Sequence, residues 1–536
     1  MKGLRLSEEE KKGVKIRLSA KDKGKSVELQ AVGKVVSDRL AHTDAIRLSL
    51  GKVWCPIKGI DCKEVGESRF IFTFYQESGK RKRLIMGPGS EDIGNFVGQF
   101  VEADTEADGN AIGKYLRIKE DAALKCVVED LEEKKNTKAK QYSRVSWLKD
   151  GNRNTRYFMA FASARKKMNR IKELKKEDGM VVKEGEELSN YVRSFFQELF
   201  TSNMGNRLDE LIAKVEPRVT EPMHAILDAE FTREEVKAAL DHIGDLKAPG
   251  LDGMPLVVYK RHWDFMGDKV VSEVLSVLNG GPIPEGWNDT VVVLIPKVKS
   301  PSRIKDLHLI SLCNVIYKLE SKVIANRLKI VLPNIISENQ SAFVPGRLIT
   351  DNVLIAYELS HYLLNKRGGK EGIAAVKADM SKAYDRVEWI FLAAMLCKLG
   401  FKQHWVDLIM KCVTSVKYQI KVNGALTQQF SPSRGLRQGD PASPYLFAIC
   451  AEGLSALLHV GERTGLISGI KICSRAPLVS HLFFVDDSML LMKATREEAE
   501  AMRNILELYE NYSGQCINTE KSAVMFSPNT SACDRV

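Results

Sequence analysis

The stretch His481-Leu482-Phe483-Phe484-Val485-Asp486-Asp487-Ser488-Met489-Leu490-Leu491-Met492 places two adjacent aspartates between two apolar runs. Two short apolar runs around a polar pair predict a β-hairpin with both carboxylates at its tip. A plain turn is the alternative interpretation, because Asp side chains favour turns by hydrogen-bonding the local backbone. The apolar runs argue against that alternative, since a turn exposed to water needs no such setting. Two carboxylates at the edge of a core repel each other and stay ionised only around a cation.

A third carboxylate follows another apolar run. Residues Ala374 to Asp379 predict a buried strand that ends in Asp379, and residues 380–385 turn into a helix. Beside the Asp486-Asp487 hairpin, Asp379 completes an oxygen-only site suited to Mg²⁺, which binds few carboxylates together with substrate phosphates. Two such ions would activate a primer 3′-hydroxyl and stabilise the leaving pyrophosphate.

The length, composition and net charge of the chain agree with an intracellular protein that binds a polyanion. Its 536 residues allow two or three domains, and its net charge of +11 favours a nucleic-acid partner. The ten cysteines form no C-x-x-C pair, so we expect no zinc site. The apolar runs are too short to cross a bilayer, and the start Met1–Leu4 lacks a signal-peptide pattern. We therefore expect no membrane partner and a location in the nucleus, the cytoplasm or both.

Three regions of the chain differ in composition and sequence pattern. Residues 1–118 contain a strand-like patch, Ser68 to Tyr75, and predict a small α+β domain of unknown purpose. Residues 119–230 are helical and charged, with fourteen Lys or Arg against four Asp or Glu between positions 131 and 175. Interleaved aromatic residues there suit single-stranded RNA, although a solvated linker is the alternative. Residues 231–536 hold the chemistry, and Thr232 with Glu235 predicts a capping box at a helix start.

The motifs of the third region carry a resemblance. In one order, from about Phe231 to Ser527, they resemble the reverse transcriptase of plant non-LTR (LINE-type) retrotransposons, with core motifs at 290–527. The matching segments are Lys247–Gly253, Leu294–Lys297, Asn339–Arg347, Asp379–Asp385, Arg434–Pro444, Phe484–Asp487 and Ser513–Ser522. Segments at 93–98, 101–105 and 113–117 resemble a fragment of the gag-like domain of such elements, and 147–155 resembles the block before their polymerase.

The resemblance implies a fold. That fold is α+β, a right-hand polymerase with fingers and palm but a missing thumb, preceded by a charged helical region and a small α+β fragment. The reaction is RNA-directed DNA synthesis with two Mg²⁺ ions, or Mn²⁺. Its partners are an RNA template, a DNA primer and deoxynucleoside triphosphates.

The resemblance also assigns roles to residues. It makes Asp379, Asp486 and Asp487 the metal-binding triad. It makes Lys521 a proton donor near the pyrophosphate, and the alternative is that Lys521 is a surface lysine without a catalytic role. Residues expected to bind the nucleotide are Tyr384, Gln438, Gly439, Lys297 and Arg347. Tyr384 matches a steric gate that occupies the space of a ribose 2′-hydroxyl, or else is a core aromatic.

Several positions depart from the family pattern. His308 stands where the family has an arginine that would contact the triphosphate, and imidazole supplies neither the fork nor the fixed charge. Ala442 replaces the usual Leu, and Val485 the usual Ala. A catalytically weak remnant that at most binds RNA is therefore the alternative function. A group II intron maturase-like protein fits the segments before the palm less well.

Overall fold

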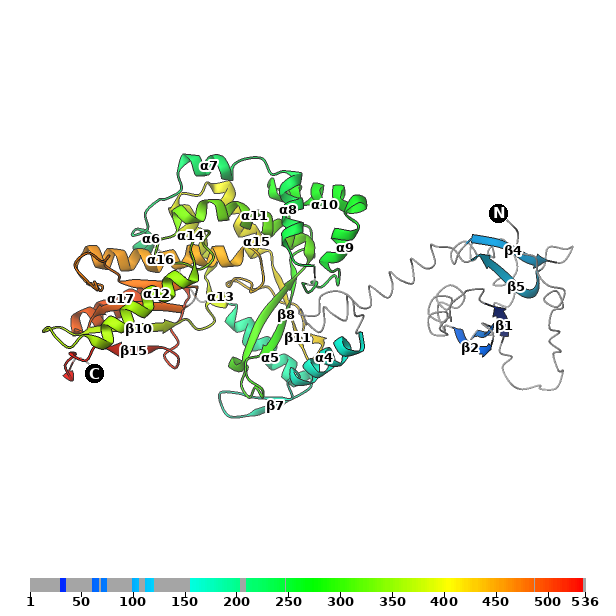
Figure 1. Ribbon diagram of the computed structural model, residues 1–536, viewed down its shortest axis with the longest axis horizontal. Coiled ribbons are helices and arrows are strands. Elements are labelled where there is room, and N and C mark those ends of the chain that lie inside the picture. Colours follow the sequence, from blue (N-terminus) through cyan, green and yellow to red (C-terminus); the bar gives the residue numbers. More distant parts are fainter. Residues whose placement is uncertain are drawn as a thin grey trace. The chain divides into compact units, whose positions relative to one another are not determined.

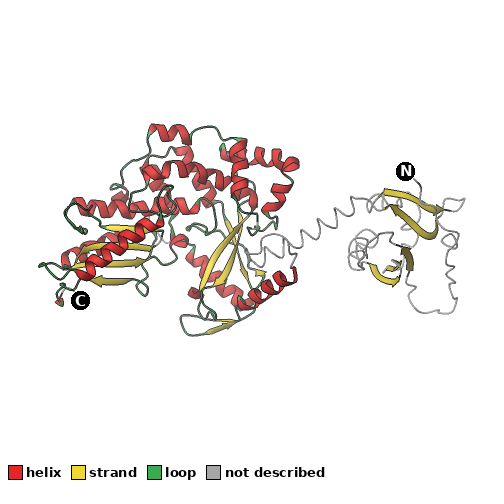
Figure 2. Cartoon of the chain, in the orientation of Figure 1, coloured by secondary structure: helices red, strands yellow, loops and turns green. Residues whose placement is uncertain are grey.

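A computed structural model gives the structure of the chain (Figures 1 and 2). It describes residues 29–34, 60–66, 69–74, 99–105, 111–119, 155–202, 209–245, 247–485 and 487–533. The chain divides into two compact units, residues 1–138 and 139–536. The predicted boundaries at 118 and 230 remain predictions.

The described part of the first unit consists of antiparallel strands. Three of them form a sheet in the order β1-β3-β2, and the other two pair with each other. The strands are β1 Leu29–Lys34, β2 Ile60–Gly66, β3 Arg69–Phe74, β4 Gln99–Thr105 and β5 Ala111–Lys119. The strand expected at Ser68 to Tyr75 is thus confirmed as β3. The residues at 93–98 that suggested a gag-like fragment lie outside the described residues.

A four-stranded antiparallel sheet, here called the acidic sheet, carries the aspartates in the second unit. Its strand order is β13-β14-β10-β15. The strands are β10 Ile373–Asp379, β13 His481–Phe484, β14 Asp487–Lys493 and β15 Ala523–Phe526. Both the predicted hairpin and the predicted buried strand ending in Asp379 are confirmed.

Both faces of the acidic sheet are buried over most of their length. Ala374 and Phe483 face the main core, while Ala375 and Leu482 pack against Leu359 of helix α12 (Ile349–Asn365). Successive residues of a strand point to opposite faces, so burial of both faces requires continuous apolar runs. This arrangement explains why the strands show unbroken apolar stretches that give way to charge only at their ends.

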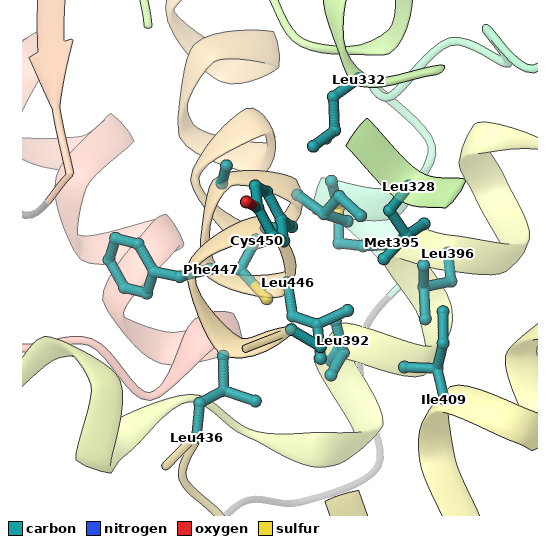
Figure 3. Close-up of a cluster of buried hydrophobic side chains, with 14 of the residues drawn as sticks. Leu328, Leu332, Leu392, Met395, Leu396, Ile409, Leu436, Leu446, Phe447 and Cys450 are labelled. Carbon is teal, nitrogen blue, oxygen red and sulfur yellow. The ribbon is translucent and has the colours of Figure 1, made fainter. Parts of the chain in front are cut away.

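A central part of the main core lies among four helices (Figure 3). They are α11 Val315–Ile335, α14 Trp389–Leu399, α15 Gln403–Thr414 and α16 Ser443–Arg463. Each fully buried Leu or Phe side chain contributes roughly 1.5–3 kcal/mol. The apolar run after Pro444 forms most of α16, which carries Pro444 in its first turn. Among the described residues α16 alone has the length and hydropathy of a membrane span, and 83% of its apolar window is buried inside the unit, as in a core helix of a soluble protein.

A second four-stranded sheet, here called the second sheet, has its own core. Its order is β12-β11-β8-β9, with β8 and β11 parallel. The strands are β8 Asp289–Pro296, β9 Leu307–Cys313, β11 Lys417–Val422 and β12 Ala425–Leu426. Helix α5 (Glu186–Leu199) packs Phe196 and Leu199 against Val292 and Tyr418 of this sheet.

The remaining elements complete the second unit. They are α4 Thr155–Met168, β6 Glu173–Lys175, β7 Val181–Lys183, α6 Asp209–Ile212, α7 Glu221–Leu227, α8 Arg233–His242, α9 Leu256–Arg261, α10 Trp263–Leu278, the short 3₁₀ helix Ile304–Asp306, α13 Ala383–Arg386 and α17 Arg496–Ser513. The capping box is confirmed: Thr232 Oγ1 accepts from Glu235 N at 3.3 Å, and Thr232 N donates to Glu235 Oε2 at 3.0 Å.

Candidate active site

Asp379 and Asp487 face each other at one end of the acidic sheet. They are directly paired in the antiparallel register of β10 and β14, so their side chains project from the same face. Directly opposite residues have Cβ atoms about 4.5–5.5 Å apart, and like charges there are destabilising. Asp486, the third predicted ligand, lies outside the described residues. The structure therefore brings together two of the three predicted carboxylates.

A tight turn presents this pair. Phe484 pairs with Asp487, which leaves only Val485 and Asp486 to connect the two strands. Val485 has φ +58°, a left-handed conformation that two-residue hairpin loops require but that β-branched residues rarely adopt. Such a residue costs on the order of 1–3 kcal/mol unless its surroundings hold it.

Two lysines and an amide surround the carboxylates. Lys521 Nζ lies 3.9 Å from Asp379 Oδ2, and Lys377 Nζ lies 3.4 Å from Asp487 Oδ1; both lysines are largely exposed. Asn518 donates to Asp379 from its side chain at 3.3 Å and from its backbone N–H at 2.7 Å. Lys521 thus lies beside Asp379, and its role as a proton donor remains a prediction. Sequence reasoning missed Lys377, although its spacing of two residues from Asp379 on a strand marked it as a neighbour on the same face.

The segment after Asp379 packs its polar groups against the interior. The Tyr384 ring is half-buried and stacks on Phe447 with ring centroids 4.8 Å apart. Burial raises the pKa of Asp385 to about 6, against the opposing charges of Lys382 and Lys297. Tyr384 therefore contributes to the core, and its role as a sugar gate remains a prediction.

A glycine-bounded loop carries Gln438. Gly435 and Gly439 have φ of +99° and +109°, and a Cβ at Gly435 would lie 2.7 Å from the Asp385 carbonyl oxygen. The Gln438 carbonyl accepts from Ser311 N at 2.9 Å, while its side-chain Oε1 is buried and has no hydrogen-bond partner among the described residues. The loop thus needs glycine at Gly435 and leaves one polar atom of Gln438 available.

A buried ion pair, which sequence reasoning missed, holds this loop. Arg437 Nη2 lies 2.9 Å from Asp440 Oδ2, and both side chains are almost fully buried. The remaining partners of Arg437 are Tyr317, Asn288 and the Cys412 carbonyl, while Asp440 accepts from Ala442 N at 2.9 Å and from Ser321. Two opposite charges three residues apart in an otherwise apolar and glycine-rich loop were the available signal.

The other predicted nucleotide-binding residues lie on different elements. Lys297 follows β8 and is exposed, and His308 is exposed on β9 opposite Ile295. Arg347 donates to the carbonyl oxygens of Pro333 at 3.0 Å, Ile336 at 2.8 Å and Gln340 at 2.6 Å, and also to that of Ser337. The guanidinium of Arg347 is therefore bonded to backbone carbonyls of the chain itself. Its contact with a nucleotide remains a prediction.

Comparison with known proteins identifies the region around Asp379 and Asp487. Residues 295–532 match the family model of the reverse transcriptase, an RNA-dependent DNA polymerase. Over these residues the chain is similar to reverse transcriptases. Its aspartate pair, Tyr384, the Gln438 loop and Lys521 all lie within the match. The domain is mixed α+β, as predicted.

Relatives connect this reverse transcriptase domain to non-LTR retrotransposons. The chain is 30% identical over 450 residues to an uncharacterized 149 kDa protein of transposon TX1 from Xenopus laevis, covering 82% of this chain and 33% of the relative. It is 26% identical over 260 residues to the Pol polyprotein of an R2 element from Nasonia vitripennis, covering 48% and 24%. It is also 48% identical over 67 residues to an uncharacterized mitochondrial protein of Arabidopsis thaliana, covering 12% of this chain and 55% of that protein. The chain spans about a third or less of the two transposon proteins.

The basic segment before the reverse transcriptase domain is described only in part. Lys134, Lys135 and Arg153 lie outside the described residues. Arg165, Lys166 and Lys167 form the last turn of α4, and the Arg165 guanidinium lies 5.3 Å from the Phe161 ring centroid. Plant origin, the gag-like fragment and RNA contact by this segment all remain predictions.

Proposed function

We propose that the chain is an RNA-directed DNA polymerase that adds deoxynucleotides to the 3′ end of a primer. The observation that carries this proposal is the direct pairing of Asp379 with Asp487 inside a matched reverse transcriptase domain. Its partners are an RNA template, a DNA primer and deoxynucleoside triphosphates, as the reaction requires.

In this proposal the acidic sheet with its helices is the palm, and the second sheet with α5 forms the fingers of a right-hand polymerase. The separate hydrophobic clusters of the two sheets support this division. The hydrogen bond from Ser311 N on β9 to the Gln438 carbonyl supports a shared nucleotide site, because it joins the second sheet to a loop whose Leu436 N donates to the Tyr384 carbonyl at 2.7 Å.

The donor set suits a divalent ion. Reverse transcriptase domains use divalent metal ions such as Mg²⁺. Asp379 and Asp487 offer hard oxygen ligands, and a cation between them would relieve the repulsion of two carboxylates in direct register. We infer that Asp379, Asp486 and Asp487 hold two Mg²⁺ ions, or Mn²⁺. When bound, these ions activate the primer hydroxyl and neutralise charge on the leaving pyrophosphate.

The chain's own residues supply positioning and proton transfer. Lys521, exposed beside Asp379, can donate a proton to the leaving pyrophosphate. The Tyr384 ring, which stacks on Phe447, would exclude a 2′-hydroxyl, and Gln438 would lie against the incoming nucleotide or the template. Lys297 would contact the triphosphate as a point charge.

The experiment is primer extension on an RNA template with purified protein and Mg²⁺. Activity in the unmodified chain that disappears in Asp379→Asn supports the proposal. Asp241→Asn, an exposed carboxylate on α8, is the matched control and should leave extension unchanged. Undiminished synthesis in Asp379→Asn would contradict the assigned site.

The second candidate is an RNA-binding remnant without synthesis, and His308 favours it. An exposed imidazole at the predicted triphosphate contact provides no fixed positive charge at neutral pH. Filter binding distinguishes the candidates: RNA binding without any extension in the unmodified chain supports the remnant.

A further inference from the structure

The segment Asn339–Gln340–Ser341 belongs to a sequence motif that has no part in the proposed function. This segment runs alongside β13 as a parallel neighbour. Phe483 N donates to the Asn339 carbonyl at 2.8 Å, and Ser341 N donates to the Phe483 carbonyl at 3.4 Å. The segment therefore extends the acidic sheet beside the strand that leads into the turn.

Side-chain amides add to this backbone pairing. Asn339 Nδ2 donates to the His481 carbonyl at 2.7 Å, and Asn352 Nδ2, on α12, donates to the Phe483 carbonyl at 2.9 Å. Asn339 and Asn352 thus hold β13 through their amide side chains, and the Gln340 side chain contacts Val485, the residue that follows β13. We call Asn339, Gln340 and Asn352 the amide bracket.

Gln340 acts on the turn itself. Its side chain is 2% exposed, and its Oε1 accepts from Val485 N at 3.3 Å and from Ala342 N at 3.0 Å. Val485 is the residue with φ +58°, a conformation that a β-branched side chain rarely adopts. Strained residues persist only where the surrounding structure determines them, and Gln340 provides a bond to the Val485 N–H.

We propose that the amide bracket, with Gln340 as its central member, positions the aspartate turn for metal binding by holding Val485 in its left-handed conformation. This inference rests on the proposed polymerase function. Asp487 follows the turn directly and pairs with Asp379. A change at Val485 therefore alters the separation of the two carboxylates, and a loss of 1 Å in positioning can lower catalysis about a hundredfold.

The test begins with Gln340→Met, which keeps the length of the side chain and removes the acceptor. Hydrogen–deuterium exchange should rise in the peptide spanning 482–488. The Mg²⁺ concentration for half-maximal extension should rise at least about fivefold, while KM for deoxynucleotides changes less than about twofold. Gln419→Met, the same substitution on β11 of the second sheet, is the control and should change neither quantity.

A second variant separates positioning from loss of folding. Glycine adopts positive φ without strain, so Val485→Gly in the Gln340→Met background should recover at least half of the lost Mg²⁺ dependence. Val485→Ala, which keeps a Cβ, should not. Unchanged exchange in Gln340→Met, a normal Mg²⁺ dependence despite faster exchange, or no recovery with glycine would each overturn the inference.

The inference remains testable if the unmodified chain extends no primer, an outcome that defeats the proposed function. Mn²⁺ binding to the full chain by calorimetry then replaces extension as the readout. Weaker Mn²⁺ binding in Gln340→Met than in Gln419→Met supports the amide bracket, and equal binding overturns it.

Discussion

The acidic sheet and the second sheet differ in how their parts meet along the chain. The acidic sheet closes through a hairpin with a two-residue connection, and its four strands are antiparallel. The second sheet pairs β8 in parallel with β11, more than a hundred residues later. It also receives Ile171, whose backbone exchanges two hydrogen bonds with the Asn423 side chain, 252 residues away in sequence. Local pattern therefore encodes the β13–β14 hairpin, whereas β10 pairs with β14 more than a hundred residues later, as β8 does with β11.

The two sheets also differ in charge. Two carboxylates lie at the end of the acidic sheet. In the second sheet, His308 on β9 lies opposite Ile295 of β8, and Lys297 directly follows β8. In the proposed polymerase one sheet holds the metals and the other holds the triphosphate.

Breaking the buried Arg437–Asp440 pair should lower the free energy of unfolding far more than breaking an exposed ion pair. Arg437→Met leaves Asp440 as an uncompensated buried charge, which typically costs about 3–5 kcal/mol. Urea denaturation measures the loss. Arg463→Met, which breaks the exposed pair with Glu216, should cost less than about 1 kcal/mol. Equal losses in the two variants would show that the buried pair does not hold the loop.

Glu320 should make stability fall as pH rises. Burial raises its pKa to about 7 from an ordinary value of 4.5, so the folded chain holds a proton that the unfolded chain releases between these values. Stability therefore decreases from about pH 4.5 upward, and the full penalty is present above pH 7. Glu320→Gln should stabilise the protein by about 2–3 kcal/mol at pH 8 and hardly at all at pH 4. An equal gain at both pH values would contradict this assignment.

His308→Arg should lower KM for deoxynucleotides if the second sheet contacts the triphosphate. A charged contact to the triphosphate contributes about 1.5–3 kcal/mol, which lowers KM for deoxynucleotides by roughly ten- to a hundredfold. Steady-state extension measures the change. His404→Arg, an exposed histidine on α15, is the control and should leave KM unchanged. A low KM for deoxynucleotides in the unmodified chain would show that His308 does not weaken triphosphate binding.

Tyr384→Val should have the smallest effect on stability and a specific one on sugar choice. Removing the stacked pair with Phe447 costs about 0.5–1.5 kcal/mol beyond the area lost. If the ring excludes a 2′-hydroxyl, ribonucleotide incorporation should rise relative to deoxyribonucleotide. Competition between the two substrates measures the ratio, and an unchanged ratio would leave Tyr384 as a core residue only.

The sequence predicted what depends on neighbours in the chain. The hairpin at Asp487, the strand ending in Asp379 and the cap at Thr232 follow from local alternation, apolar length and capping chemistry. The pairing of Asp379 with Asp487 was expected only through the shared chemistry of the carboxylates and the family resemblance, because register is a tertiary property.

Other features had a weak local signal or none. The buried Arg437–Asp440 pair looks like surface charge in sequence, since Arg and Asp are seldom fully buried unless paired. Gln340 acts on Val485 across 145 residues, and no spacing rule connects them. Val485 itself was noted only as a mild departure, because a backbone angle is not visible in a side-chain pattern.

The central claim is that Asp379 and Asp487 form one catalytic site. Single-turnover primer extension with Asp379→Asn, Asp487→Asn and the double variant tests it most directly. Residues that act as a unit are not additive, so each single change should reduce the rate about a thousandfold and the double change should reduce it no further. Losses that multiply in the double variant, or an Asp487→Asn protein with the parent's rate, would contradict the claim.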